Sequence, residues 1–240
     1  MSMTVIIPSK CADNLEACVS AVRQYEPEAR IIVIDDGVEL TEPRSLYDFG
    51  DIEWWDGAKP FIYGRNCNIG IRAAMASLEC SGVVLLNDDA LLQTPGGFTA
   101  MANACEDYPE FGLIGATCNN VGNPNQHRRD IGLRDEPRMV CFVCVYIPRS
   151  TIDRVGLLDE RYTGYGLDDD DYGFRVRAAG LKIGVHDGCY VDHGSLNSSY
   201  RGPAGAGGDF RGNMRIFIEK WGHDNWSQPK ETSQFKELFP

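Results

Sequence analysis

The sequence is poor in basic residues. Among its 240 residues, 23 are lysine or arginine and 35 are aspartate or glutamate, so the formal net charge is −12. Proteins that bind nucleic acids or anionic membranes generally rely on a basic surface. The acidic balance therefore disfavours both classes, and it is compatible with binding divalent cations, which prefer clustered oxygen ligands.

Long apolar runs and metal-type cysteine spacings are also missing. No run approaches the ~20 apolar residues of a membrane-spanning helix, and the first apolar stretch, in residues 3–8, is too short for the core of a secretory signal. The nine cysteines include one C-x-x-C, formed by Cys141 and Cys144, and it lies inside an apolar, strand-like run. We expect buried, reduced thiols and a cytoplasmic protein.

Neither glycine-rich phosphate-binding motif occurs. The first predicted strand is followed by PSKCADN instead of G-x-G-x-x-G, and the sequence contains no G-x-x-x-x-G-K-[ST]. If the protein binds nucleotide phosphates, another group must neutralise them. A divalent metal held by carboxylates at strand ends would do so.

Strand-like and helix-like patterns alternate along the chain, which predicts an α/β layered fold. Short apolar runs rich in β-branched residues predict strands at 4–9, 29–37, 82–90, 111–120, 139–148 and within 182–195. Helical spacing of apolar residues predicts helices at 14–25, 68–78, 97–108, 149–156, 168–179 and 213–226.

Acidic residues follow two of the predicted strands and begin one of the helices. Asp35–Asp36 and Asp88–Asp89 end buried strands, and Asp168–Asp171 form a run of four. In open α/β sheets, ligands bind beyond the carboxyl ends of the strands. One such pair would be interpreted as a turn or a helix cap, but two pairs and a tetrad together favour a functional site.

The order of these motifs resembles that of inverting GT-A glycosyltransferases, in particular glycosyltransferase family two and its rhamnosyltransferase-like relatives. The segments that carry the resemblance are TVIIPSK, IIVIDDG, RNCNIGIRAA, VVLLNDDA, GLDDDDYGFRVRAAG and VDHGS. The tetrad is also similar to the GGEDDD segment of animal galactosyltransferases. The resemblance implies a GT-A fold, a Rossmann-like mixed sheet flanked by helices. It implies a catalytic domain at 1–195, followed at 196–240 by a glycine-rich lid loop and a C-terminal helix packed on the same domain.

The resemblance also implies a site for a nucleotide-diphosphate-sugar donor, with a UDP-sugar favoured. Asp36 matches the residue that holds the base or ribose. Asn87 replaces the first aspartate of the family's D-x-D motif, which leaves Asp89 as the expected ligand of Mn²⁺ or Mg²⁺, together with His193. The other donor-binding residues that the resemblance implies are Pro8, Ser9, Arg65, Asn68 and Asp88.

The tetrad is similar to the acidic start of the family's catalytic helix. Asp169 is the expected base for the acceptor hydroxyl, with Asp168 next. Neighbouring carboxylates raise one another's pKa, which suits a base that works near neutral pH. The positive end of the helix offsets part of their repulsion. Asp171 and Arg175 stand four residues apart and are expected to pair.

The sequence does not determine the acceptor. Trp54 and Trp55 are candidates for an aromatic platform under a sugar, although aromatic pairs are more often part of a core. The polar loop at 123–139 carries Arg128 and Arg129 and admits a glycan, another hydroxyl-bearing polymer or modified DNA. In the predicted lid, Arg201 and Arg211 flank the glycine-rich stretch 202–208 and are expected to reach the diphosphate on closure.

These observations predict a metal-dependent, inverting glycosyltransferase that moves a sugar from a nucleotide-diphosphate sugar to an acceptor hydroxyl. Two other functions stay open. A sugar nucleotidyltransferase would release pyrophosphate and would need no base at Asp169, and a non-catalytic module would bind a nucleotide-sugar without turnover. The released product separates the three.

Overall fold

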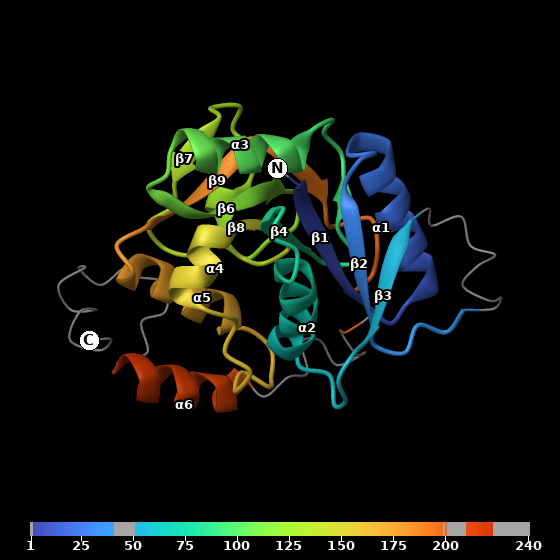
Figure 1. The fold of residues 1–240 in the computed structure, drawn as a ribbon. Coiled ribbons are helices and arrows are strands. Elements are labelled where there is room, and N and C mark those ends of the chain that lie inside the picture. Colours follow the sequence, from blue (N-terminus) through green and yellow to red (C-terminus); the bar gives the residue numbers. More distant parts are fainter. Residues whose placement is uncertain (1, 41–50, 199, 201–209, 223–240) are drawn as a thin grey trace.

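The computed structural model describes residues 2–40, 51–198, 200 and 210–222 (Figure 1). Within these ranges the chain forms one nine-stranded mixed sheet in the order β3-β2-β1-β4-β8-β6-β9-β5, with β7 paired to β9. Helices cover both faces of the sheet (Figure 1). This arrangement confirms the predicted α/β class.

The first half of the sheet is parallel. Its strands are β1 (Ser2–Ser9), β2 (Arg30–Asp35), β3 (Ile52–Asp56) and β4 (Cys80–Leu86). Between them lie α1 (Ala12–Tyr25) and α2 (Tyr63–Met75). β1, β2 and β4 are mostly apolar and buried, as expected for parallel strands covered by helices on both faces, whereas the outer strand β3 is partly exposed. Because the four strands are parallel, their carboxyl ends meet at one edge, where the acidic pairs follow.

The second half of the sheet is mixed. β8 (Cys144–Pro148) runs antiparallel to β4 and to β6 (Phe111–Cys118), and β6 runs parallel to β9 (Lys182–Asp192). The short strands β5 (Leu91–Leu92) and β7 (Leu133–Asp135) pair antiparallel with β9. The remaining elements are α3 (Gly97–Asp107), the 3₁₀ helix η2 (Pro124–Gln126), α4 (Arg149–Val155) and α5 (Asp168–Ala178).

Alternate residues of the strands contribute to two core layers. Val5 and Ile7 of β1 pack with α1 and α3 on one face, while Ile6 packs with α2, α4 and α5 on the other. Gly70 lets α2 approach the sheet closely, because a Cβ at this position would lie 2.5 Å from Ile6 Cγ2. The backbone of α2 is thereby held against β1, beside the strand ends.

A third apolar cluster joins the C-terminal helix α6 (Phe210–Trp221) to α5. Its buried residues are Tyr162, Leu167, Phe174, Phe217 and Trp221. Helix α6 begins and ends earlier than the predicted 213–226, and residues 223–226 lie outside the described residues. In Figure 1, α6 lies alongside α5, at the side of the molecule away from α3.

Three elements differ from the sequence-based expectation. β3, with Trp54 and Trp55, was not predicted as a strand, and α2 begins at Tyr63, five residues before the expected start. The expected strand at 139–148 begins only at Cys144. Residues 139–143 are apolar because Val140 and Phe142 are buried as the chain passes beside the strand ends, not because they pair in the sheet.

Two general expectations can also be compared with the structure. All nine cysteines lie among the described residues and none of them forms a disulfide, and seven are buried. None of the described helices combines the length and the apolar character that a membrane span requires.

Candidate active site

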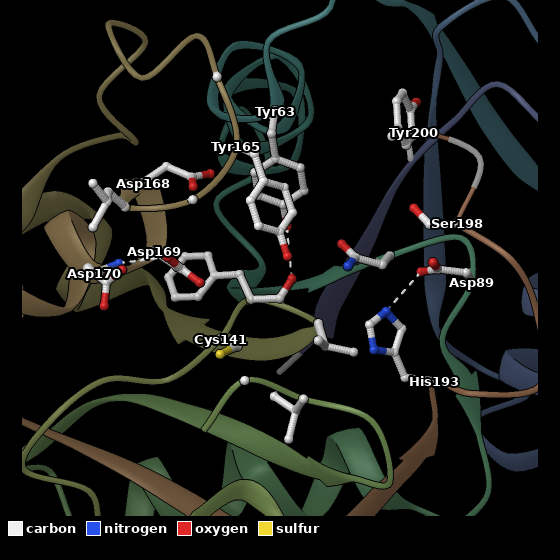
Figure 2. Close-up of a pocket in the computed structure, with 18 of the residues that line it drawn as sticks. Tyr63, Asp89, Cys141, Tyr165, Asp168, Asp169, Asp170, His193, Ser198 and Tyr200 are labelled. Atoms are coloured by element: carbon white, nitrogen blue, oxygen red, sulfur yellow. Dashed lines mark hydrogen bonds and ion pairs between the residues drawn. The ribbon is translucent and has the colours of Figure 1, made fainter. Parts of the chain in front are cut away.

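A cavity of about 610 Å³ opens at the carboxyl ends of β1 and β4 (Figure 2). β1 contributes Pro8, the turn after β4 contributes residues 87–89, and the segment before β8 contributes Met139 and residues 141–143. The start of α5 adds residues 168–170, and His193 follows β9. The cavity thus collects both the D-x-D-like turn and the tetrad, which lie about 80 positions apart in the sequence.

Asp89 and His193 face each other on one side of this cavity (Figure 2). His193 Nε2 lies 3.2 Å from Asp89 Oδ1, and Nδ1 lies 2.6 Å from the carbonyl oxygen of Asn120. A carbonyl oxygen only accepts hydrogen bonds, so Nδ1 carries a proton. In the neutral ring, Nε2 therefore carries a lone pair and faces Asp89 Oδ1, which is also an acceptor. Two acceptors this close repel each other unless a proton or a cation lies between them.

This pair fits a divalent cation in its donor chemistry. Carboxylate oxygen and imidazole nitrogen both suit Mn²⁺, and a ligating histidine usually fixes its other ring nitrogen through a hydrogen bond of the kind seen at Asn120. Within the part of the chain that the structure describes, no group of three or more His, Cys, Asp or Glu side chains could hold a metal. A cation bound here would therefore take its remaining ligands from substrate and water.

The aspartates of the strand ends are held by neighbouring side chains. Ser9 Oγ donates to Asp88 Oδ2 at 2.7 Å, and both residues are buried. Lys59 bonds to the carboxylate and the carbonyl of Asp36.

Tyr200 stacks on Phe61 with ring centroids 4.0 Å apart. Burial and the charges of Asp36 and Asp88 raise the pKa of the Tyr200 hydroxyl, so it stays protonated.

The first three aspartates of the tetrad line the opposite side of the cavity (Figure 2). The chain enters α5 through a left-handed turn, with φ of +78° at Gly166 and +73° at Leu167. Burial and the charge of Asp169 raise the pKa of Asp168 to about 7. Burial also raises the pKa of Asp169, although its Oδ1 accepts a hydrogen bond of 2.9 Å from the Asp170 amide.

Asp171, the fourth aspartate, points away from the cavity and anchors α6. It accepts hydrogen bonds from Arg175 Nε at 3.0 Å and from Trp221 Nε1 at 2.9 Å, and it pairs with Lys220 at 2.8 Å. The expected pairing of Asp171 with Arg175 is confirmed. The tetrad therefore combines two functions: three carboxylates face the cavity and one holds the C-terminal helix.

Four of the expected donor-binding residues are not part of the cavity lining: Ser9, Asp36, Arg65 and Asn68. Both amide atoms of Asn68 bond to the Leu158 backbone, and its nitrogen also donates to Glu160 at 3.0 Å. Arg65 Nε lies 3.6 Å from the Glu160 carboxylate. In this structure both residues fasten α2 to the segment that follows α4.

The expected acceptor-binding residues also lie away from the cavity. Trp54 and Trp55 are on β3, the outer strand of the parallel half, where Trp54 packs against the core and Trp55 donates to Glu53. Arg128 pairs with Asp130, and Arg129 donates to Asn125.

Of the two arginines expected in the lid, the structure describes only Arg211. Arg201 lies outside the described residues, and Arg211 is exposed in the first turn of α6.

Several aromatic residues of the site were missed by the sequence analysis. Tyr63 and Tyr165 stand between the two acidic sides of the cavity (Figure 2), and Tyr63 OH donates to the Phe142 carbonyl at 3.2 Å. Asn213 of α6 brackets Tyr165: it accepts from the Gly164 amide at 3.1 Å and donates to the Gly166 carbonyl at 2.6 Å. The signal for Tyr165 was present as an aromatic residue between two glycines just before the tetrad.

Comparisons with known proteins agree on the fold. No protein-family model matches the sequence. GalNAc-T7, solved with UDP, GalNAc and Mn²⁺, superposes on 92% of this chain with a TM-score of 0.70 at 14% identity. TarS from S. aureus superposes on 99% with a TM-score of 0.67 at 12% identity. The chain therefore has the GT-A fold that the resemblance implied.

One curated protein is similar in sequence. It is the uncharacterized protein y4gI of Sinorhizobium fredii (strain NBRC 101917 / NGR234), which is 28% identical over 213 residues that cover 74% of this chain. The chain spans 23% of that relative, 48% of the GalNAc-T7 chain and 42% of the TarS chain.

Proposed function

We propose that this chain is a metal-dependent, inverting glycosyltransferase that transfers a sugar from a UDP-sugar to a hydroxyl group. One observation carries the proposal. A single cavity in a GT-A fold has the Asp89–His193 pair on one side and the carboxylates of Asp168 and Asp169, whose pKa values are raised, on the other. A cation-binding pair and a separate base are the two groups that direct displacement at an anomeric carbon requires.

Asp89 and His193 would hold the cation, and the diphosphate of the donor would complete its coordination. When bound, Mn²⁺ or Mg²⁺ supplies Lewis-acid stabilisation of the negative charge that develops on the leaving diphosphate. The GalNAc-T7 structure contains UDP and Mn²⁺, which supports the choice of donor and metal. Asp36 and Asp88, held by Lys59 and Ser9, lie near the ring of Tyr200, where they would bind the nucleoside.

On the opposite side, Asp169 would accept the proton of the acceptor hydroxyl. The Asp170 amide fixes its carboxylate, and burial raises its pKa toward the range in which a carboxylate is an effective base. Asp168, with a pKa of about 7, is the alternative base. The hydroxyl would attack the anomeric carbon from the face opposite the diphosphate, so the configuration inverts without a covalent intermediate.

The decisive experiment measures the product released from nucleotide-sugars. Purified protein is incubated with a panel of UDP-sugars, acceptor glycans and Mn²⁺, and release of nucleoside diphosphate is followed. A parallel incubation with UTP, sugar 1-phosphates and Mn²⁺ is followed for release of pyrophosphate. The proposal expects UDP release that depends on Mn²⁺, and NMR of the product fixes its anomeric configuration. Pyrophosphate release would identify a nucleotidyltransferase, and binding of UDP-sugar without either product would identify a binding module.

A further inference from the structure

The charge of the cavity restricts the acceptor, provided that the proposed function holds. Five aspartates line the cavity: Asp88, Asp89, Asp168, Asp169 and Asp170. No lysine or arginine lines it among the residues that the structure describes. Two of the aspartates lie on the diphosphate side, where a divalent cation would compensate them. The other three form the side on which the acceptor hydroxyl must meet its base.

Three cations among the described residues are engaged outside the cavity. Lys10 lies over the ring of Tyr200 at 4.7 Å from its centroid, and Lys59 bonds to Asp36, so both are on the nucleotide side. Arg177 lies behind Asp170, with its guanidinium over the Phe174 ring and bonded to the Pro137 carbonyl. It offsets part of the charge of Asp170 and is not itself part of the cavity lining.

Three of the four arginines of the loop at 123–139 are engaged away from the cavity. Arg134 pairs with buried Asp187 at 2.6 Å and donates to two backbone carbonyls. Arg128 and Arg129 bond within their own loop. The loop contributes only Met139 to the cavity lining. Arg128 and Arg129, for which modified DNA was considered, thus lie away from the proposed base, whereas Arg138 is exposed next to Met139.

Aromatic side chains supply the remaining surface near the tetrad. Tyr165 is 47% exposed and Phe210 is 42% exposed, and both line the cavity. Aromatic rings of this kind offer an apolar face and, in tyrosine, a polar tip. Such a surface suits the C–H face of a pyranose ring, with hydroxyl groups donating to carboxylates.

We propose that the acceptor is a glycan whose receiving sugar is uncharged or carries an amine. A sugar that bears phosphate, sulfate or carboxylate would bring a further negative charge next to three aspartates, with no lysine or arginine in the described cavity lining to meet it. DNA would do the same at every phosphate. Burial raises the pKa values of Asp168, Asp169 and Asp170, and neighbouring aspartate charges raise those of Asp168 and Asp170 further, so an added anion would oppose ionisation of the base.

A binding experiment tests the acceptor class separately from turnover. The protein, saturated with UDP and Mn²⁺, is applied to a glycan array that carries neutral, amine-bearing, and sulfated, phosphorylated or carboxylated sugars, with 5-hydroxymethylcytosine DNA alongside. We expect binding to neutral or amine-bearing glycans. Preferential binding of anionic glycans or of the DNA, or binding of no glycan, would overturn the proposal. UDP release from UDP-sugar by the same protein reports on the proposed function, so the two can fail independently.

A pair of charge variants links the preference to the cavity. Thr163 is exposed at the cavity lining, and Leu78 is 94% exposed and not part of it. Thr163→Lys should improve binding of a sulfated form of the best glycan, relative to the unsulfated form, by roughly three- to ten-fold. Leu78→Lys adds the same charge elsewhere and should leave this ratio unchanged. An equal response of the two variants would assign the preference to overall net charge and reject the cavity as its source.

Discussion

Asp89 Oδ1 and His193 Nε2 approach to 3.2 Å, and the hydrogen bond from Nδ1 to the Asn120 carbonyl leaves Nε2 as the nitrogen whose lone pair is available in the neutral ring. At this scale the site depends on tautomers and protonation states. Sequence patterns indicate which residues have the right chemistry, but they do not indicate which lone pair points where.

Asp89→Ala should abolish the contribution of Mn²⁺ to UDP binding. With one ligand removed, we expect UDP affinity in Mn²⁺ to fall by at least about ten-fold, and addition of EDTA to have little further effect. Titration calorimetry with and without the metal measures this. Asp130→Ala removes an exposed carboxylate that pairs with Arg128 and serves as the control. An Asp89→Ala protein that keeps its metal-dependent affinity would rule out Asp89 as a ligand.

Asp169→Asn should separate binding from chemistry. The amide keeps the shape of the side chain but cannot take a proton, so we expect the transfer rate to fall by about 10²–10⁴-fold. The affinity for UDP should change little, because Asp169 lies on the other side of the cavity. If Asp168→Asn is the inactive variant while Asp169→Asn turns over normally, the base is Asp168.

Asp168 should make stability and activity depend on pH in opposite directions. Its pKa is about 7 in the folded protein against an ordinary value of 3.8. A raised pKa means that its contribution to stability is complete below pH ~4 and is lost as pH rises through ~7. The unfolding free energy should therefore decline between pH 5 and 8. Over this range, the unfolding free energy of Asp168→Asn should fall by about 2 kcal/mol less than that of the wild type. This is roughly half of the free energy to which a three-unit pKa shift corresponds.

The measurement is urea unfolding at several pH values. A base that must be ionised gives the opposite slope for the transfer rate, which should rise over the same range. Equal pH slopes for the unfolding of wild type and Asp168→Asn would show that the carboxyl is not perturbed in the folded state.

Among the elements, α5 is the one whose first turn makes two kinds of contact. Asp168, Asp169 and Asp170 line the cavity, and Asp171 ties the helix to α6 through Lys220 and Trp221. The acidic repeat predicted the helix start, and the i,i+4 spacing predicted the Asp171–Arg175 pair. The contacts with α6 were not predictable in this way, because their partners lie 49 and 50 residues further along the chain.

Lys220→Met should destabilise the protein far more than Arg161→Met. Both cations pair with Asp159 Oδ2, at 2.9 Å and 2.7 Å, but the Lys220 side chain is 12% exposed and that of Arg161 is 56% exposed. Lys220 also compensates buried Asp171. We expect a loss of about 3–5 kcal/mol for Lys220→Met, since it leaves a buried charge poorly paired, and at most about 1 kcal/mol for Arg161→Met. Chemical denaturation measures both, and similar losses would contradict the burial difference.

The segments that sequence analysis missed have physical reasons for being missed. β3 is an edge strand, and its sequence IEWWD lacks the regular alternation of apolar and polar residues that marks a half-buried strand. Glu53 and Trp55 bond to each other on its surface. Residues 139–143 carry the apolar pattern of a strand but line the cavity or fill the core beside it. An apolar segment is expected to be buried, but a buried segment need not be a strand of the sheet.

Over the whole molecule, the α/β class and the gathering of acidic strand ends followed from the sequence. The structure confirms the GT-A fold. The placement of the tetrad opposite Asp89 depends on how β8 inserts antiparallel between β4 and β6, which no local pattern specifies. Tyr165 and Asn213 belong to the site only through that long-range arrangement and the docking of α6.

A chain cut after residue 195 should not fold stably, although the resemblance places the catalytic domain at 1–195. Removal of α6 exposes Tyr162, Leu167 and Phe174 and leaves Asp171 without Lys220 and Trp221. We expect a lower unfolding free energy and increased binding of a hydrophobic dye, measured against the full chain and against a chain of residues 1–222, which retains α6. A 1–195 chain as stable as the 1–222 chain would show that α6 is a separate appendage.

The anchoring of Asp171 also sets an order of events during synthesis. Trp221 follows Asp171 by 50 residues. At about 5–20 residues per second a ribosome needs roughly 3–10 s to add them. During that time the nascent α5 lacks two of the partners of its buried carboxylate, while the strands before it have already been made. The wall of the cavity that bears the carboxylates therefore matures last, and a growing chain acquires its completed site only after α6 has left the ribosome.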